Sequence, residues 1–372
     1  MSSRVLMGLV VLALTVFSFG IAGFHSAPAV WRHLLFAVGV VPLILAAMLY
    51  FVPVLTRTAA APSGIMWLPV AAAVLGVSTV LAFMRRPDAV AWIAGMFLIV
   101  VTLEIAWIWQ RRNHVLGSAH PGLYWYLAAL AALLLALTAV VLREAYVEYG
   151  PSLRTFHLHL NLLGFLGLTA IGTLRVLLPT TLAASDAAAN TYLRVQLPYV
   201  NAATVCIALG AAVWPPLSWL GAVVWLWPAV LLLQAIRYER LRGLGMQHAA
   251  LALSAACLGW FLMLLAGLAH GLGVVSADAL MWLLVFLFLL PLVTGASSYL
   301  LPLWRWPGKM TQAHTHMRAQ LMHFSGVRVL AFYLSGGMSL LNIDGAQIPA
   351  VIALLSYLAQ VGKAFLPERQ EG

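Results

Sequence analysis

Residues 159–179 read HLNLLGFLGLTAIGTLRVLLP, an apolar run that begins with a histidine and ends with a proline. An α-helix rises about 1.5 Å per residue, so about 20 apolar residues span the roughly 30 Å of hydrocarbon in a bilayer. This run therefore predicts a membrane-spanning helix. The whole chain has the same character, because 63% of its 372 residues are hydrophobic and only 8% are charged. One soluble core cannot bury that much apolar surface, and we predict an integral membrane protein.

Twelve apolar runs of this kind follow one another, separated by short polar or Pro/Gly-containing breaks. They predict an all-α polytopic membrane protein with a single transmembrane domain over residues 1–372. The seventh run contains Pro198 and is the least regular. The expected spans are residues 4–25, 29–55, 63–84, 89–110, 120–145, 156–180, 192–213, 215–236, 247–275, 279–302, 319–341 and 346–366.

The charges predict how the chain is oriented. The net charge is +10, but the basic residues are mostly confined to short loops, where they set orientation and do not indicate binding to nucleic acid. Thirteen Lys and Arg residues fall in the loops on the side of the N-terminus, and five fall on the opposite side. Because basic loops stay on the cytoplasmic side, both termini are expected there, in a bacterial-type inner membrane with lipid as the main partner. Cys206 and Cys257 lie inside apolar runs and are expected to be small core residues.

Two other runs align with residues 159–179. They are HLLFAVGVVPLILAAMLYFVP at 33–53 and WLLVFLFLLPLVTGASSYLLP at 282–302. In all three, a proline stands twenty positions after the first residue and a small residue stands at the thirteenth step. The three starting residues are 126 and then 123 positions apart. Such a period indicates an internal repeat.

These runs are the second, sixth and tenth of the twelve, so the repeats are expected at approximately residues 1–118, 119–243 and 244–372. We therefore expect three four-helix arcs related by a pseudo-threefold axis along the membrane normal. Small residues at the shared step favour close packing of neighbouring helices in lipid.

Five histidines are expected near the outer face: His25, His33, His157, His159 and His270. At about 100° per residue, His157 and His159 point about 160° apart and cannot easily bind one metal ion together. They suit two sites on opposite flanks of one helix, each completed by a histidine of a neighbouring helix. Neutral imidazole is a good ligand for heme iron and for copper. The alternative is that histidines at helix ends lie at the headgroup level and hold no metal.

A helix that begins His-x-His, with a glycine thirteen steps and a proline twenty steps after the second histidine, resembles a known family. It is similar to the heme-ligating tenth helix of subunit I of the heme-copper oxidases and nitric oxide reductases, especially the cytochrome-cbb type. It also resembles the His-Ala-His helix of the NnrS family of heme- and copper-containing membrane proteins linked to nitric oxide tolerance. The run that begins at His33 is similar to the oxidase helix that supplies the other low-spin heme ligand. Twelve helices in three arcs is also the plan of that superfamily.

The chain departs from this family at the second metal. The active oxidases have a further His before a Tyr on helix 6 and a His-His pair at the start of helix 7, whereas the seventh run here reads VQLPYVNAATVCIALG. The His-x-His pair lies on helix 6, and Trp282 takes the equivalent place on helix 10. The family's binuclear centre is therefore not expected. No steady-state oxygen reduction is expected either, and whether the chain is a heme-dependent oxidoreductase stays open.

The resemblance implies that His33 and one of His157 and His159 are the axial pair of a b-type heme. The remaining histidine of the pair would face a second heme or a copper ion, completed by His270 or His25. Two axial imidazoles suit electron transfer, whereas one imidazole and an open position bind nitric oxide, carbon monoxide or dioxygen. The sequence leaves both possibilities open, as well as one or two hemes b.

Two other functions remain open: a transporter or metal-handling permease, for which proline-broken helices would form the pathway, and an assembly subunit that keeps the fold without a cofactor. Glu104, inside the fourth run, is either a proton relay or the partner of Arg111 or Arg112. The segment at residues 309–324 contains three His and three Met, which are either copper donors or hydrated and space-filling residues.

Overall fold

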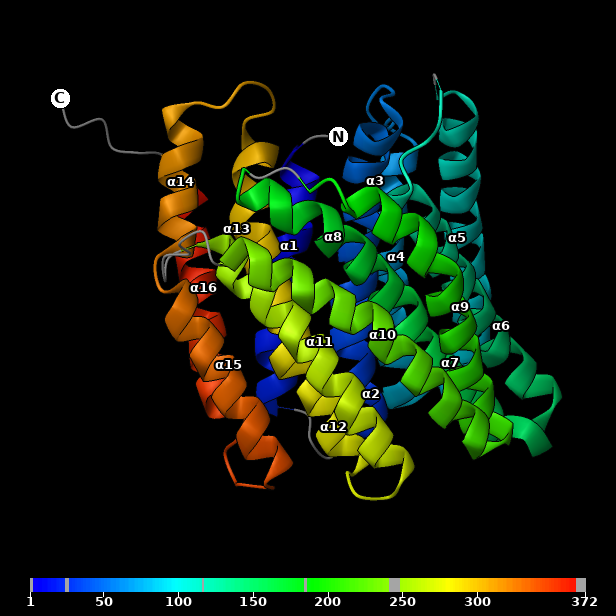
Figure 1. Cartoon of the computed structure of the whole chain (residues 1–372). Coiled ribbons are helices and arrows are strands. Elements are labelled where there is room, and N and C mark those ends of the chain that lie inside the picture. The colour runs from blue at the N-terminus through cyan, green and yellow to red at the C-terminus, as the bar shows by residue number, and fades with distance from the viewer. Residues whose placement is uncertain (1–2, 24–26, 116, 184–185, 241–247, 366–372) are drawn as a thin grey trace.

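The computed structural model describes residues 3–23, 27–115, 117–183, 186–240 and 248–365, and these residues lie in helices or in the segments that join them (Figure 1). Eleven helices among them are long and apolar enough to cross a membrane. The prediction of an all-helical, multi-pass chain is thus confirmed for the described residues. His25 lies outside them.

The helices run up and down between two ends of the molecule (Figure 1). α1 begins and α16 ends at the same end, which is the predicted cytoplasmic end. The seventh expected span, α9, is continuous although it contains Pro198. The bounds are α1 Ser3–Gly23, α2 Pro28–His33, η1 Leu34–Val40, α3 Val41–Thr56, η2 Ile65–Trp67, α4 Leu68–Arg85, η3 Pro87–Ala89, α5 Val90–Asn113, α6 Gly122–Ala145, η4 Val147–Tyr149, α7 Gly150–His159, η5 Leu160–Leu168, α8 Thr169–Thr181, α9 Ala189–Val213, α10 Pro215–Arg240, α11 Ala249–Gly271, α12 Ala277–Leu283, η6 Leu284–Leu289, α13 Leu290–Arg305, α14 Gln312–Met322, α15 Ser325–Leu340 and α16 Ile348–Phe365.

Three long helices contain a π-helical segment, in which each turn is wider than in an α-helix. η1 directly follows His33, η5 directly follows His159, and η6 begins two residues after Trp282. Pro42 and Pro291 come just after η1 and η6. Because proline clashes with the carbonyl four residues before it, a wider turn at that place removes the clash. The three segments start at nearly the same step of the three aligned runs, while the division of the whole chain into repeats stays a prediction.

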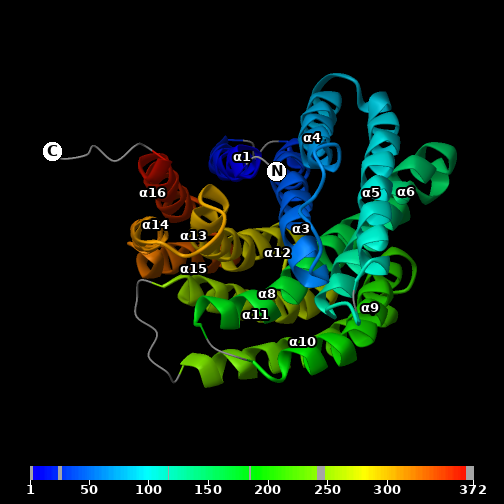
Figure 2. The same ribbon diagram turned by 90° about the horizontal axis from the view of Figure 1, so that it is seen from above.

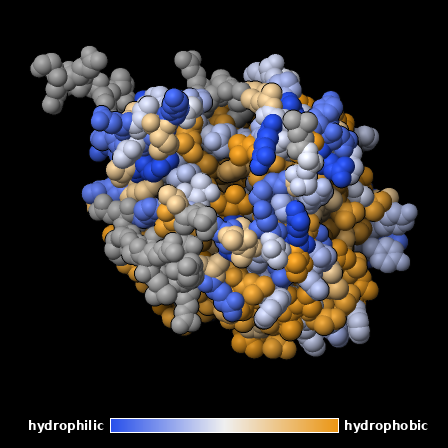
Figure 3. Space-filling model, turned by 45° about the horizontal axis from the view of Figure 1, so that its top comes forward, coloured by the Kyte–Doolittle hydropathy of each residue, from blue (hydrophilic) through white to orange (hydrophobic). Residues whose placement is uncertain are grey.

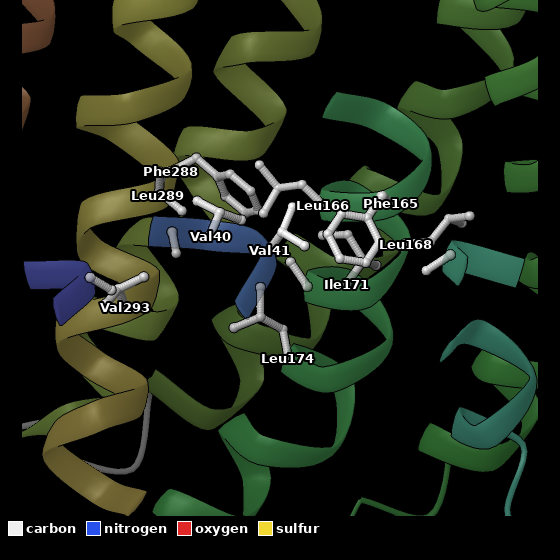
Figure 4. Packing of buried hydrophobic residues seen from close by; sticks show 14 of the residues in the cluster. Val40, Val41, Phe165, Leu166, Leu168, Ile171, Leu174, Phe288, Leu289 and Val293 are labelled. Carbon is white, nitrogen blue, oxygen red and sulfur yellow. The ribbon is translucent and has the colours of Figure 1, made fainter. Parts of the chain in front are cut away.

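The π-containing helices lie in the interior of the molecule (Figure 2). α3, α8 and α13 line a common apolar cavity of about 100 Å³. Residues of η1, η5 and η6, including Val40, Leu166 and Phe288, belong to one buried cluster (Figure 4). Around them, α5 contacts α6, α10 contacts α11, and α16 contacts α1. The fold therefore brings segments more than 100 residues apart in the sequence together at its centre.

The eleventh expected span differs from the prediction. Instead of one helix over residues 319–341, α14 ends at Met322 and α15 begins at Ser325. Phe324, between them, has a left-handed backbone with φ 47°. The break leaves the carbonyl oxygen of Leu321 without a helical partner, and the guanidinium of Arg328 donates a hydrogen bond to it at 2.7 Å. This span is the only one of the twelve expected spans that is not among the eleven long apolar helices of the described chain.

Hydrophilic side chains gather at the predicted cytoplasmic end, and the visible flank is mostly hydrophobic (Figure 3). Large apolar residues of the described chain are exposed, for example Trp92 and Ile352. A broad apolar surface of this kind is expected to contact lipid, because in water it would cause aggregation.

We expect Gly259→Ala to destabilise the fold, because a Cβ atom at Gly259 in α11 would overlap the backbone carbonyl of Leu287 in η6. Overpacking of this kind costs about 1–3 kcal/mol. Gly267→Ala in the same helix is the matched control, since a Cβ there would meet no atom within 4 Å. Thermal unfolding of the purified variants in detergent measures both effects. Equal transition temperatures for the two variants would contradict this close helix contact.

Candidate functional site

A cavity of about 400 Å³ lies at the predicted outer end, between the helices of the first and second predicted repeats. α2, η1, α4, α5, α6, α7 and η5 all contribute to its wall. The size falls in the range of about 300–1,000 Å³ that is usual for small-molecule and cofactor sites. Its walls are mostly apolar, with a few polar groups at defined places, as in cofactor pockets. The polar lining residues are Arg32, His33, Thr79, Arg143, Arg154, His157 and Asn161.

His33 lines this cavity at the end of α2. Its Nδ1 lies 2.7 Å from the carbonyl oxygen of Ala29, one turn earlier in the same helix. A carbonyl only accepts, so this contact places the ring proton on Nδ1 and leaves the lone pair on Nε2. The ring also packs against Phe83 of α4, with 4.5 Å between the ring centroids. The orientation of the imidazole is therefore fixed by two contacts.

His157 lines the same cavity from α7. Its Nδ1 lies 2.9 Å from the carbonyl oxygen of Ala136 in the neighbouring helix α6, so its ring proton is also on Nδ1. Asn161 donates to the backbone carbonyl of His157 at 2.8 Å, and its amide nitrogen is 3.4 Å from Nε2. That last contact is too long to be a strong hydrogen bond. His33 and His157 are close enough to interact electrostatically.

The structure does not bring His159 into this cavity. Its Nδ1 lies 2.9 Å from the carbonyl oxygen of Thr155, and His270 of α11 is close enough to act on it electrostatically. His270 in turn has its Nδ1 2.8 Å from the carbonyl oxygen of Val275. The two histidines of the His-x-His pair therefore face different neighbours: His157 faces α6 and the cavity with His33, and His159 faces His270.

Three arginines give one end of the cavity a positive charge. Arg143 lies in the last turn of α6 and Arg154 in the first turns of α7, and both are exposed at the outer end. Arg32 is more buried and pairs with Asp278 at 2.5 Å, while its Nε has no hydrogen-bond partner among the described residues. One carboxylate does not balance three guanidinium groups. The cavity therefore favours a ligand with an apolar body and an anionic group at the outer end.

The residues around this cavity fit a b-type heme. Two neutral imidazoles from two helices present unprotonated Nε2 atoms, and each is oriented by a backbone carbonyl on its Nδ1, the usual arrangement around ligating histidines. Apolar side chains from six α-helices, α3 among them through Val41, and from two π segments suit the faces of a porphyrin. The three arginines suit its propionate groups. The fit rests on the donor set and on the charge at one end.

Copper has less support from the geometry. Within the described residues, no three or more His, Cys, Asp or Glu side chains are grouped so that they could hold a metal ion. His314, one of the histidines of the segment 309–324, uses both ring nitrogens in other contacts: Nδ1 accepts from the backbone N–H of Thr311 at 3.0 Å, and Nε2 lies 2.8 Å from the carbonyl oxygen of Trp306. It forms a capping box at the start of α14, which is a structural role.

Sequence reasoning missed Arg143, Arg154 and Asn161 as site residues. The two arginines were interpreted only as orientation signals in outer loops. They lie at the same predicted depth as His33 and His157, and that coincidence of depth was the available signal. Asn161 follows His157 by one helical turn, which was a weaker signal for a polar residue on the same face.

No protein-family model matches the chain, and a search of curated proteins found no match either. The function is therefore inferred from the geometry of the site.

Proposed function

We propose that this chain is a membrane heme protein in which His33 and His157 are the two axial ligands of a b-type heme, and that it transfers electrons. The observation that carries this proposal is the presence of two neutral imidazoles, each with its ring proton on Nδ1 and an unprotonated Nε2, in one apolar cavity with three arginines. A heme bound there would supply one-electron chemistry. The chain's own residues orient the two imidazoles, exclude water with apolar walls and balance the propionate charge.

The arrangement of the helices supports the proposal of three four-helix arcs as in subunit I of heme-copper oxidases. α5–α6, α10–α11 and α16–α1 are the contacts that would join successive arcs. The π segments of the second, sixth and tenth spans meet at the centre. This plan places the heme cavity between the first and second arcs.

A pair of tryptophans gives independent support for the pseudo-threefold relation. Trp282 and His33 are the first residues of the aligned tenth and second runs. Trp31 and His157 both stand two positions before the first residue of their own runs, the second and the sixth. Trp31 and Trp282 stack with 4.6 Å between ring centroids and 2° between planes. Trp282 and Trp31 therefore occupy the same two aligned positions on the tenth and second spans that His33 and His157 occupy on the second and sixth spans. Stacked rings fill that place, whereas the histidines border a cavity.

The proposal covers electron transfer and does not extend to copper or to a gaseous substrate. Two axial histidines leave no open position for nitric oxide or dioxygen. His159 and His270 together offer only two nitrogen donors.

We further propose an orientation with both termini in the cytoplasm, since the loop charges favour it and the cavity would then open near the outer face.

Absorbance spectroscopy of the detergent-purified protein tests the proposed function. Protein from heme-sufficient cells is expected to be coloured, with a Soret band and sharp bands typical of low-spin, six-coordinate heme. A pyridine hemochrome assay should identify heme b at one per chain. A colourless, iron-free preparation of folded protein would overturn the proposal and leave the transporter and assembly-subunit alternatives.

A further inference from the structure

Glu104 in α5 is a buried acidic residue that the proposed heme site does not use. Its side chain is 0% exposed, and neither carboxyl oxygen has a hydrogen-bond partner among the described residues. The two pairings considered from the sequence are not formed. Arg111 donates to the carbonyl oxygen of Ala60 at 3.3 Å, and Arg112 donates to Asn113 at 3.2 Å.

No other charged group of the described chain compensates Glu104. None of the hydrogen bonds or ion pairs among the described residues involves its carboxyl group, which is fully buried. Within the membrane, the titratable residues of those helices have other contacts or lie at the ends. They are Tyr50 on α3, which packs against Trp304, Tyr126 on α6, which contacts Thr173, and Tyr124, Arg143, Glu144 and Arg85 at the ends of α6 and α4.

The surroundings of Glu104 contain a second unsatisfied polar group. Trp107 is one turn further along α5, is 4% exposed, and has no described partner for its Nε1–H. Residues three apart lie on the same side of a helix. A carboxylic acid and an indole N–H at this spacing can share an internal water molecule, which would satisfy both groups.

Glu104 also lies on the same face of α5 as the residues that line the proposed heme cavity. Val90 and Phe97 line the cavity, and Glu104 follows Phe97 by seven residues. Seven residues are about two turns, so Phe97 and Glu104 share one face of α5, with Glu104 roughly 10 Å nearer the predicted cytoplasmic end. The carboxyl group therefore lies between the cavity and that end of the membrane.

We propose that Glu104 is a proton-binding site in the membrane interior, with its carboxyl group protonated at neutral pH and able to exchange its proton with water. An ionised carboxylate without a partner is costly in a buried apolar place, so the neutral acid is the stable form. Exchange requires only that the site shared with Trp107 be reached by water from one end of α5. This inference does not depend on heme binding.

Carbodiimide labelling of the full chain in detergent tests the protonated state. A hydrophobic carbodiimide adds to protonated acids in apolar surroundings, whereas a water-soluble one labels exposed acids. We expect a stable adduct on Glu104 with the hydrophobic reagent only, found by peptide mass spectrometry, and adducts on the exposed Glu144 and Glu148 with the water-soluble reagent. Absence of the Glu104 adduct, with the rest of the chain covered, would overturn the proposal.

Infrared spectroscopy tests the exchange of the proton. The protein should show a band of a protonated carboxyl group that shifts in D₂O and that is absent in Glu104→Gln. If Glu104→Gln does not fold, Glu104→Asp replaces it and should move the band. A band that does not shift in D₂O would mean that the proton is sealed in, and the exchange would be refuted. Both measurements can be made on heme-free protein, so their failure is distinct from failure of the heme proposal.

Discussion

Replacing His33 or His157 with alanine is expected to remove most of the heme from the purified protein. Each substitution deletes one of the two Nε2 donors in the cavity and leaves the apolar wall in place. Loss of residues that only orient a metal ligand costs about 10–100-fold in metal affinity, so loss of a ligand itself should cost at least tenfold. The heme-to-protein ratio from the pyridine hemochrome assay measures the effect.

His159→Ala is the matched control for this experiment. His159 is the same residue type on the same helix, two positions from His157, but it does not line the cavity and faces His270. We expect it to keep the heme of the cavity. The ligand assignment is wrong if His159→Ala loses the pigment while His157→Ala keeps it. Size-exclusion chromatography of each variant separates loss of heme from loss of fold.

Most of the fold was predictable from the sequence, because one physical requirement dominates it. In lipid the backbone must satisfy its own hydrogen bonds, so every long apolar run becomes a helix. This holds even for α9, where Pro198 interrupts the ladder locally without ending the helix. Pro42 and Pro291 each stand nine positions after the first residue of their aligned runs, and η1 and η6 end just before them.

The break between α14 and α15 was not predictable from the same rule. Residues 323–326 read HFSG, whose Ser-Gly pair is a weak turn signal, but the residue at the left-handed position is Phe324, which gives none. What stabilises the break is tertiary: Arg328 donates to the carbonyl oxygen of Leu321 and to Gln360 at 2.8 Å, and its guanidinium lies over the ring of Tyr357. These three partners of the arginine are all neutral.

The candidate site was predictable in kind but not in detail. Helical periodicity placed His157 and His159 on opposite flanks, yet the alignment of the three runs favoured His159 as the equivalent of His33. Which ring enters the cavity depends on how α7 is rotated against α6, and the contact of His157 with the carbonyl of Ala136 records that rotation. A single sequence contains no information on such contacts between helices.

Carbon monoxide is expected to leave the spectrum of the reduced wild-type protein unchanged, and the protein is expected to consume no oxygen above the protein-free control. Both follow from the same geometry, because His33 and His157 would occupy both axial positions of the iron. If the resemblance to the oxidases holds, α9 would take the place of the helix that begins with the His-His pair of the second metal, and residues 189–213 contain no histidine. That pair of donors would then be missing from this chain.

The residual heme of His157→Ala provides the positive control for the carbon monoxide experiment. Removing one imidazole opens one axial position, so this fraction should show a shifted Soret band with carbon monoxide, and added imidazole should reverse the shift. A shift of similar size in the wild-type protein would show that one histidine does not bind the iron. In that case the functional feature of the cavity would be the open position on the iron. Binding of nitric oxide or dioxygen would then replace the proposed function, which is electron transfer by an iron held between two fixed imidazoles.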